Sequence, residues 1–319
     1  MHDKIFGCIQ AHNSFVIAYS GGLDSHVLLH TMFVLRTQQP AMTIQAVHIN
    51  HQLNAESSRW ATHCQSVCDA LTIPIHIEKI TLNLEPGDSL EEKAREARYA
   101  ILKKYTDKNS VLLTAHHLND QAETFLLQAL RGAGSKGLSA MPVKKTWGAS
   151  FLIRPLLNIS RDALEKYAND HRLQWIEDDS NTDPRFRRNF LRHEVFPLLK
   201  KQCPAVMENF ARCAQLMADN EKIISDVINL DFEIIQTDDI GKIDLKKLQE
   251  FSEQKQKLLL RHWFSHNKLR MPSAKHLAQI LQDVVQAGPQ AKPLFSVEKY
   301  TIKRDRRFLY LVPKLTRLR

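Results

Sequence analysis

The feature that most constrains the fold is a short apolar run that ends in a glycine pair and continues into a helical pattern. The run is Phe15-Val16-Ile17-Ala18-Tyr19, the turn is Ser20-Gly21-Gly22-Leu23-Asp24-Ser25, and apolar residues with helical spacing follow from His26. A strand that turns directly into a helix is typical of βαβ units, in which parallel strands pack against helices. The opening of the chain therefore predicts an α/β architecture.

The alternation of strands and helices continues through the first half of the chain. Further strands are expected at residues 44–49, 73–77 and 111–115, and helices at residues 58–71 and 89–105. Pro74 places the third strand at a sheet edge or at the strand's own start, and Asn119 or Asp120 is expected to cap the next helix. We expect a mainly parallel sheet flanked by helices, with ligands bound at the carboxyl ends of the strands.

The pattern changes after Pro155. An amphipathic helix is expected at 160–172, then a charged connector at 178–192, a long helix at 205–230 and a smaller mixed unit rich in lysine and arginine. A length of 319 residues favours about two domains, at roughly 150 residues each. We expect a catalytic domain at 1–215 and a helical linker with a smaller C-terminal domain at 216–319.

Composition excludes several classes of protein. The hydrophobic content of 43% and charged content of 25% are ordinary for a globular chain. No apolar run reaches the ~20 residues of a membrane-spanning helix, and the N-terminus predicts no secretory signal. Five cysteines in a chain of this length do not form a disulfide framework, and Cys64 and Cys68 lie four residues apart on the expected buried face of a helix. The cysteines therefore indicate a reducing cytoplasm. The formal net charge of +9 favours a polyanionic partner.

The turn at residues 20–25 has the chemistry of a phosphate-binding loop. Two glycines allow close approach of the backbone, and the helix that follows presents N–H groups and a partial positive charge to an anion. The hydroxyls of Ser20 and Ser25 can donate to phosphate oxygens, whereas Asp24 would repel a bare phosphate and so indicates a bridging Mg²⁺ ion. The alternative is a plain glycine turn in which serine and aspartate only cap the helix.

These residues resemble a known family. Ser-Gly-Gly-x-Asp-Ser after a strand is the signature of the PP-loop ATP pyrophosphatases, which cleave ATP to AMP and pyrophosphate. Further segments are similar to the tRNA(Ile)-lysidine synthetases within that superfamily. They are residues 47–53, 94–99, 114–124 and 178–189, with a weaker match around 270–273.

The resemblance implies a ligase that forms a C–N bond during tRNA modification in the cytoplasm. ATP would adenylate the C2 oxygen of the wobble cytidine in an isoleucine tRNA with a CAU anticodon, and lysine would then displace AMP to form lysidine. It implies ATP and Mg²⁺ as cofactors, this tRNA and L-lysine as partners, and no membrane association.

The resemblance also assigns roles to individual residues. Asp24 and Arg98 would be catalytic, with Asp24 reaching Mg²⁺ through the ATP phosphates, and Asp120 and Glu123 would bind lysine. The expected ATP-binding residues are Ser20, Gly21, Gly22, Leu23, Asp24 and Ser25, and the expected tRNA-binding residues are Arg185, Arg187, Arg188 and Arg192. The alternatives are a local ion pair for Arg98, helix capping for Asp120 and a solvated helix start for the arginines.

Two further groups of residues have open roles. The first group is His48, His51, His116 and His117, for which contact with nucleotide or cytosine competes with ordinary buried hydrogen bonding and, less favourably, with zinc. The second is the basic tail from residue 299 to 319, where alternation with apolar residues predicts strands with one basic face, either gripping tRNA or merely solvated.

Three other functions compete with this interpretation. Sulfur insertion into tRNA by the same superfamily would call for paired cysteines that hold an iron–sulfur cluster, and the chain has no Cys-x-x-Cys. A glutamine-dependent synthetase would need an N-terminal cysteine nucleophile, where His2 stands instead. A tRNA-binding module without activity would not need the complete loop from Ser20 to Ser25.

Overall fold

The computed structural model describes residues 1–50, 56–80, 90–177, 187–288, 291–297 and 300–314. It divides into two compact units, Met1–Ala218 and Asp219–Arg319, and helix α10 (Val206–Ile235) contributes residues to both. Within the described residues, no helix is both long enough and apolar enough to cross a membrane.

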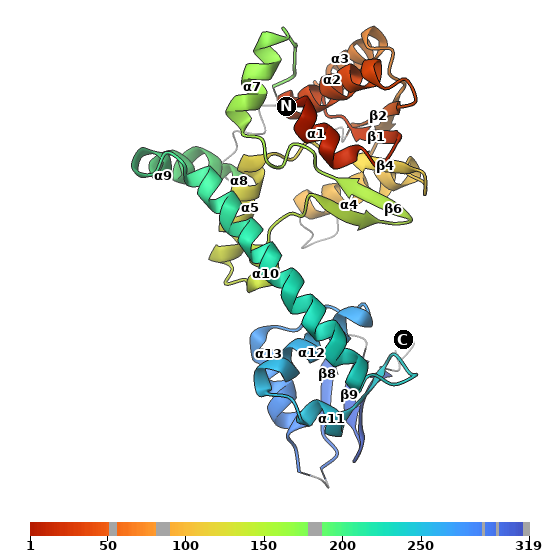
Figure 1. The fold of residues 1–319 in the computed structure, drawn as a ribbon, viewed down its shortest axis with the longest axis vertical. Helices are drawn as coiled ribbons and strands as arrows, with labels where there is room; N and C mark the ends of the chain where they lie inside the picture. The colour runs from red at the N-terminus through yellow and green to blue at the C-terminus, as the bar shows by residue number, and fades with distance from the viewer. Residues whose placement is uncertain (51–55, 81–89, 178–186, 289–290, 298–299, 315–319) are drawn as a thin grey trace. The chain divides into compact units, whose positions relative to one another are not determined.

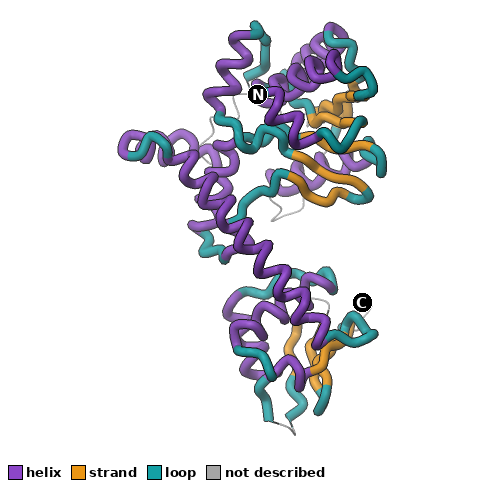
Figure 2. Tube along the Cα trace, viewed as in Figure 1, coloured by secondary structure: helices purple, strands orange, loops and turns teal. Residues whose placement is uncertain are grey.

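The N-terminal unit is built on a six-stranded sheet with the order β3-β2-β1-β4-β6-β5, and Figure 2 draws strands in orange. Its strands are β1 (Ser14–Ala18), β2 (Thr43–Asn50), β3 (Ile75–Lys79), β4 (Ser110–Leu113), β5 (Lys144–Trp147) and β6 (Ser150–Ile153). Neighbouring strands are parallel except β5, which pairs antiparallel with β6. The prediction of a mainly parallel α/β sheet is confirmed, and so is the edge position of the strand that follows Pro74. The hairpin of β5 and β6 was not predicted.

Helices cover both faces of this sheet (Figure 1). They are α1 (His2–Ile9), α2 (Leu23–Gln38), α3 (Ser57–Ala70), α4 (Leu90–Lys104) and α7 (Arg161–Asp170), whereas α5 (Leu118–Leu130) and α6 (Ser135–Leu138) belong to neither sheet core. Successive side chains of a strand point to opposite faces, so Phe15 and Ile17 of β1 join the core under α1, α2, α3 and α7, while Val16 joins the core under α4. Cys64 and Cys68 are fully buried in the first of these cores, as expected.

A separate helical cluster closes one side of the N-terminal unit. It contains α5, α8 (Arg187–Phe190), the π-helical turn η2 (Leu191–Val195), α9 (Phe196–Gln202) and the start of α10. Ala122, Leu191 and Phe196 are buried at its centre, with Val206 and Met207. This packing fixes α8 and η2 against α5, so their arginines reach the polar residues of α5.

The C-terminal unit packs helices against an antiparallel sheet with the order β7-β10-β9-β8. Its elements are β7 (Lys242–Asp244), α11 (Leu245–Gln249), α12 (Glu253–His266), α13 (Ala274–Ile280), the π-helical turn η3 (Leu281–Val285), β8 (Leu294–Val297), β9 (Tyr300–Arg304) and β10 (Phe308–Pro313). Trp263 and Phe264 are fully buried in its core together with Ile302.

The prediction that the basic residues of the tail share one solvent-facing side of the strands is wrong for Arg304. This side chain is buried beside Ile302, because residues two apart in a strand face the same way. Its Nη1 donates to the carbonyl oxygens of Val284, Val285 and Ala287 at 3.1, 3.1 and 2.9 Å. Arg304 therefore satisfies the carbonyl end of η3. Residues 315–319 of the tail lie outside the described residues.

Candidate active site

The candidate site lies where two central strands of the N-terminal sheet end. β1 and β4 are parallel neighbours, and the chain after β1 runs outward to β2 and β3 on one side, whereas β6 continues the sheet on the other. In sheets of this kind, the loops that follow the two strands diverge and leave a crevice for a ligand. Here those loops carry the glycine turn and the His116-His117 pair, so two separate sequence motifs meet at one sheet edge.

The glycine turn has a shape that only glycine permits at its centre. Gly21 has φ +85°, and a Cβ atom there would lie 2.7 Å from Ile176 Cδ1 and 2.8 Å from Cys64 Sγ. Gly22 is the N-cap residue of α2. The hydroxyls of Ser20 and Ser25 lie 3.0 Å apart, and Ser25 Oγ donates to the Gly22 carbonyl at 3.0 Å. Hydrogen bonds among its own residues thus stabilise the turn, which leads directly into the N-terminus of α2.

Asp24 lies in the first turn of α2, and the two oxygens of its carboxylate have different surroundings. Its Oδ2 is 3.6 Å from His117 Nε2 and 3.7 Å from Arg161 Nη1. Its Oδ1 is buried and finds no hydrogen-bond partner among the described residues. Burial raises the pKa of Asp24, although His117 and Arg161 pull it down. An orphaned carboxylate oxygen beside a phosphate-type loop fits a Mg²⁺ ion, which prefers oxygen ligands.

His117 joins this carboxylate to a second one. It is the N-cap residue of α5, its Nδ1 accepts from the backbone N–H of Asn119 at 3.2 Å, and Asp120 Oδ2 accepts from the backbone N–H of His117 at 3.0 Å. The N-cap position expected for Asn119 or Asp120 is therefore held by His117, whose imidazole supplies the acceptor, but Asp120 does take part in the cap as the second half of a capping box. Since Nδ1 accepts, the ring proton sits on Nε2, which faces Asp24 and lies 3.5 Å from Asp120 Oδ2.

Asp120 and Glu123 lie on one side of α5, as their spacing indicates, and both contact arginines of η2 and α8. Arg192 donates two hydrogen bonds to the Glu123 carboxylate, at 2.8 and 3.0 Å, and its Nη2 lies 3.4 Å from Asp120 Oδ1. Arg188 Nε is 3.4 Å from Glu123 Oε2, and its Nη2 donates to Thr124 Oγ1 at 3.0 Å. Two residues expected for tRNA and two expected for lysine thus form one ionic cluster.

The two carboxylates of this cluster differ in their protonation. Glu123 is completely buried, and this desolvation raises its pKa despite the pull of Arg192. Burial acts on Asp120 in the same sense, but His117, His116 and the arginines outweigh it and lower the pKa of Asp120. Asp120 is thus the carboxylate that stays charged most readily, and its contact with Arg192 is the longer one.

Other predicted residues lie at the margins or outside the described part. Arg98 is exposed on α4, and Arg187 is exposed on α8. Arg185 and His51 lie outside the described residues. His48 Nδ1 donates to the Tyr19 carbonyl at 3.0 Å. His116 Nδ1 is 3.0 Å from Thr114 Oγ1, and burial lowers its pKa to about 4.

These histidines form hydrogen bonds with protein atoms, and in the described residues no three His, Cys, Asp or Glu side chains are grouped to hold a metal ion. That arrangement argues against a zinc site at His48 and His116. The cysteines are also dispersed: Cys64 and Cys68 are buried in α3, Cys203 is exposed and Cys213 is half-buried.

Sequence reasoning missed Arg161. This residue begins α7, 137 positions after Asp24 by number, and no local motif connects the two. It belongs to the segment 154–161, whose Arg-Pro-Leu-Leu run follows β6, the strand next to β4 in the sheet. A polar residue after a strand adjoining the crevice was the available signal.

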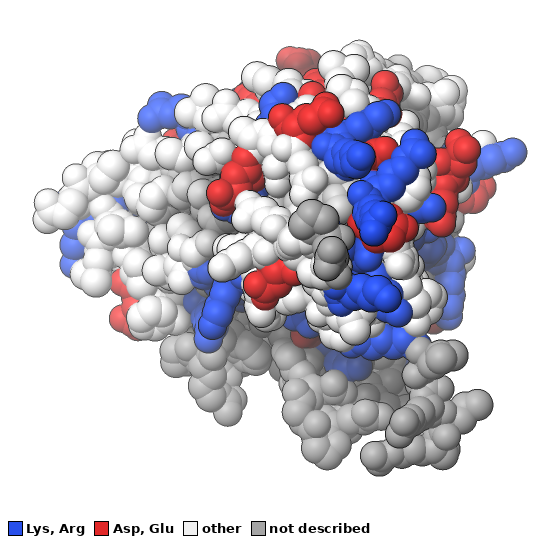
Figure 3. All heavy atoms as spheres, turned by 90° about the horizontal axis from the view of Figure 1, so that it is seen from below, with Lys and Arg blue, Asp and Glu red and all other residues white. Residues whose placement is uncertain are grey.

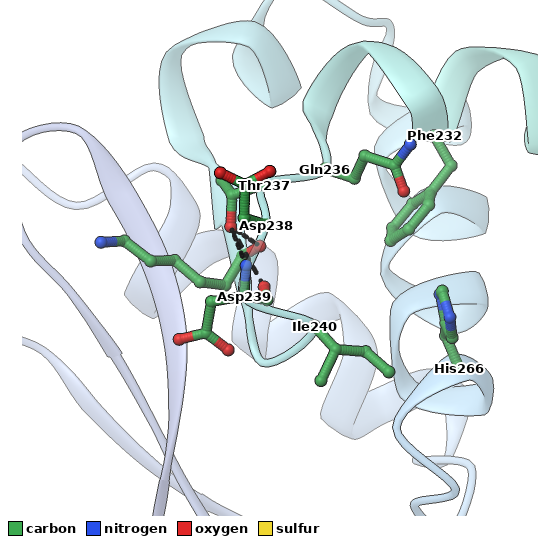
Figure 4. A pocket seen from close by; sticks show the side chains of 8 residues that line it. Phe232, Gln236, Thr237, Asp238, Asp239, Ile240 and His266 are labelled. Atoms are coloured by element: carbon green, nitrogen blue, oxygen red, sulfur yellow. Dashed lines mark hydrogen bonds between the residues drawn. The ribbon is translucent and has the colours of Figure 1, made fainter.

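The C-terminal unit has a hollow of its own at the end of α10 (Figure 4). It is lined by Phe232, Gln236, Thr237, Asp238, Asp239, Ile240, Lys242 and His266. Its turn uses its own polar groups: Thr237 Oγ1 donates to the Lys242 carbonyl at 3.0 Å, and Asp239 Oδ1 accepts from Gly241 N–H at 2.9 Å. These contacts stabilise the turn and leave no converging set of catalytic groups. In the view of Figure 3, Lys and Arg side chains lie intermixed with Asp and Glu side chains.

Comparison with known proteins defines the class first. Residues 2–199 match the model of a PP-loop domain, and residues 243–310 match that of a TilS substrate binding domain. A U34-tRNA thiolase from Methanococcus maripaludis shares the fold of part of the chain, with a TM-score of 0.58 and 18% identity over 68% of this chain and 77% of that one. Residues 2–199 thus form a PP-loop domain.

Sequence relatives then specify the family. The tRNA(Ile)-lysidine synthase of Coxiella burnetii is 45% identical over 97% of this chain and 68% of its own length. That of Photorhabdus laumondii is 40% identical over 97% of this chain and 70% of its own length. The chain belongs to the tRNA(Ile)-lysidine synthase family.

Proposed function

We propose that the protein joins lysine to C2 of the wobble cytidine in an isoleucine tRNA with a CAU anticodon, forming a C–N bond and releasing AMP and pyrophosphate. The observation that carries this proposal is the continuous contact from the glycine turn to the carboxylate pair. Asp24 meets His117, His117 meets Asp120, and Asp120 shares Arg192 with Glu123. This contact supports the proposal that one site binds both a triphosphate and an ammonium group.

The glycine turn would bind ATP. The backbone N–H groups at the start of α2 and the hydroxyls of Ser20 and Ser25 suit phosphate oxygens. Asp24 is the residue that would hold Mg²⁺, because its Oδ1 is buried and has no hydrogen-bond partner in the part of the chain that the structure describes. When bound, the ion would neutralise phosphate charge. The C2 oxygen of cytosine is a poor leaving group, so its adenylation makes the later displacement by an amine possible.

Asp120 and Glu123 would bind the ammonium group of lysine. Arg192 holds Glu123 in a short bidentate pair, which fixes the position of this carboxylate. The 3.4 Å contact between Arg192 and Asp120 is weaker in geometry, so an incoming ammonium can replace it at lower cost. The lowered pKa of Asp120 keeps its charge available for this contact.

The tRNA would approach the same crevice. Arg188 lies at its edge, half-buried against Thr124 and Glu123, and is the arginine we assign to the target nucleotide. Arg185, Arg187 and Arg192 would contribute positive charge nearby, and Arg98 would contact ATP phosphate or adenylate. The C-terminal unit, which contains the match to a substrate binding domain, would bind the body of the tRNA in a salt-dependent manner. The site of action would be the cytoplasm.

Pyrophosphate release from the purified protein tests this proposal. With ATP, Mg²⁺ and lysine, release is expected with an isoleucine tRNA that carries CAU and not with the same RNA whose wobble cytidine is changed to uridine. Turnover with a sulfur donor in place of lysine would instead favour tRNA thiolation. Binding of the tRNA without any turnover would favour a module without activity.

A further inference from the structure

Arg161 stands at the proposed ATP site without a role in the assignments made so far. Its Nη1 lies 3.7 Å from Asp24 Oδ2, and its side chain is 37% exposed, so a ligand in the crevice can reach it. Asp24 belongs to the glycine turn itself. The guanidinium group is therefore next to the place where the phosphates of ATP would bind.

Three contacts fix the position of Arg161. Its backbone N–H donates to Asn119 Oδ1 at 3.1 Å, which ties the start of α7 to the start of α5. Ser160 caps α7 through the N–H of Ala163. The Arg161 Nε donates to Glu165 Oε1 at 3.0 Å, one turn along the helix. Because Nε is taken by Glu165, the terminal nitrogens are the groups that face Asp24.

A triphosphate bound at the turn would need a nearby cationic side chain to balance its charge. Residues 20–25 contain an aspartate and no lysine or arginine, whereas a triphosphate brings several negative charges. Arg192 also acts on Asp24 electrostatically, but its guanidinium is engaged by Glu123 in a short bidentate pair. Arg161 contacts Asp24 itself, and the planar guanidinium group is well suited to bind two phosphate oxygens at once.

We infer that Arg161 binds the β- and γ-phosphates of ATP and stabilises pyrophosphate as it leaves, with Glu165 as the residue that positions the guanidinium. The inference rests on the proposed function. In the adenylation step, the bond from the cytosine C2 oxygen to the α-phosphorus forms, and the bond from the α-phosphorus to the bridging oxygen breaks. The electron pair goes to the oxygen on the β-phosphate, and Arg161 stays protonated throughout and donates hydrogen bonds to that growing charge.

Binding of pyrophosphate, measured by calorimetry with Mg²⁺ and without tRNA, tests this inference separately from catalysis. Arg161→Gln is expected to weaken binding about 10- to 100-fold, the usual effect of losing charge-assisted hydrogen bonds. Arg161→Lys should lose less, because it keeps the charge but not the two-pronged geometry. Glu165→Gln should cause a smaller loss. Lys166→Gln, an exposed change of equal charge on the same helix, should bind like the wild type.

Steady-state kinetics with tRNA supply the second measurement. Arg161→Gln should lower the rate of pyrophosphate release and leave the KM for lysine unchanged, whereas a general disturbance of the fold would change both. Melting temperatures identify misfolding, and Arg161→Lys provides the comparison if Arg161→Gln is unstable.

The inference would be overturned if Arg161→Gln bound pyrophosphate with the same affinity as the wild type. It would also be overturned if the wild type did not bind pyrophosphate. A wild type that binds pyrophosphate through Arg161 but never turns over with tRNA would leave the role of Arg161 standing and refute the proposed reaction.

Discussion

Replacing Gly21 with alanine probes how tightly the phosphate-type turn is built. Two independent penalties arise. The φ of +85° lies in the left-handed region, where a residue with a Cβ costs about 1–2 kcal/mol. The new methyl group would also lie 2.7 Å from Ile176 Cδ1 and 2.8 Å from Cys64 Sγ, and overpacking of this kind costs about 1–3 kcal/mol. We therefore expect a loss of roughly 2–5 kcal/mol in the free energy of unfolding.

Thermal and urea unfolding of the variants measure this loss. For a unit of this size, roughly 2–4 °C accompany each kcal/mol, so the melting temperature should fall by roughly 4–20 °C. ATP binding should weaken as well, because Ile176 N–H donates to the Gly21 carbonyl at 3.0 Å and movement of one displaces the other.

Two other glycines separate the contributions. Gly132 has φ +67°, and no atom of the described residues lies within 4 Å of an added Cβ. Gly132→Ala should therefore lose only the part of the unfolding free energy that comes from the backbone conformation. Gly7 lies inside α1 with open space around it, so Gly7→Ala should be neutral or stabilising by up to about 1 kcal/mol. Adding Cys64→Ala to Gly21→Ala should relieve part of the clash and give a non-additive loss. Equal losses for Gly21→Ala and Gly132→Ala would refute the close packing of the turn.

Three further predictions concern the charged residues. Asp24→Ala should abolish pyrophosphate release, whereas Asp120→Ala should raise the KM for lysine about 10- to 100-fold and leave the KM for ATP unchanged; an unchanged KM for lysine would show that the pocket is misassigned. Glu123→Gln leaves Arg192 without its buried charged partner and should lower the free energy of unfolding, measured in urea, by about 2–4 kcal/mol. This loss is smaller than for a fully buried ion pair because Arg192 is 28% exposed. Replacing both residues with leucine should restore most of the lost stability. With falling pH, kcat/KM for ATP should drop as Asp24 of the free protein is protonated through its raised pKa. The KM for lysine should respond to Asp120 only at lower pH, because the pKa of Asp120 is lowered, and an earlier rise in this KM would come from Glu123, whose pKa is raised. A kcat/KM for ATP that stays constant with falling pH would contradict the raised pKa of Asp24.

Motifs that are local in the chain gave reliable predictions. The glycine turn and the segment around His117 each follow an apolar strand, and the rule that ligands bind where such strands end places both at one crevice. The spacing of Asp120 and Glu123 put both on one side of α5, which the contacts with Arg192 confirm. Pro74 correctly marked an edge strand.

Contacts between segments that are distant in the chain could not be predicted from the sequence. Arg192 lies 69 positions from Glu123, and a π-helical turn sets the direction of its side chain, which a helical period of 3.6 does not describe. The packing of Cys64 beneath Gly21 likewise depends on how α3 crosses the sheet. These pairs follow from tertiary packing, which a single sequence does not encode in a readable pattern.

Two errors could have been avoided with local physics. His117 can cap a helix because its Nδ1 accepts a backbone hydrogen bond, although histidine is not among the preferred capping residues. Arg304 had to face inward once Ile302 did, because the two are separated by two positions in β9.

The nucleotide products of the reaction test the central claim most directly. ATP labelled on its α-phosphate, incubated with the protein, Mg²⁺, lysine and an isoleucine tRNA with a CAU anticodon, should yield labelled AMP in a one-to-one ratio with lysine bound to the RNA. Labelled ADP, or AMP formed equally well without the RNA, would contradict a site that cleaves ATP between its α- and β-phosphates in order to activate cytidine.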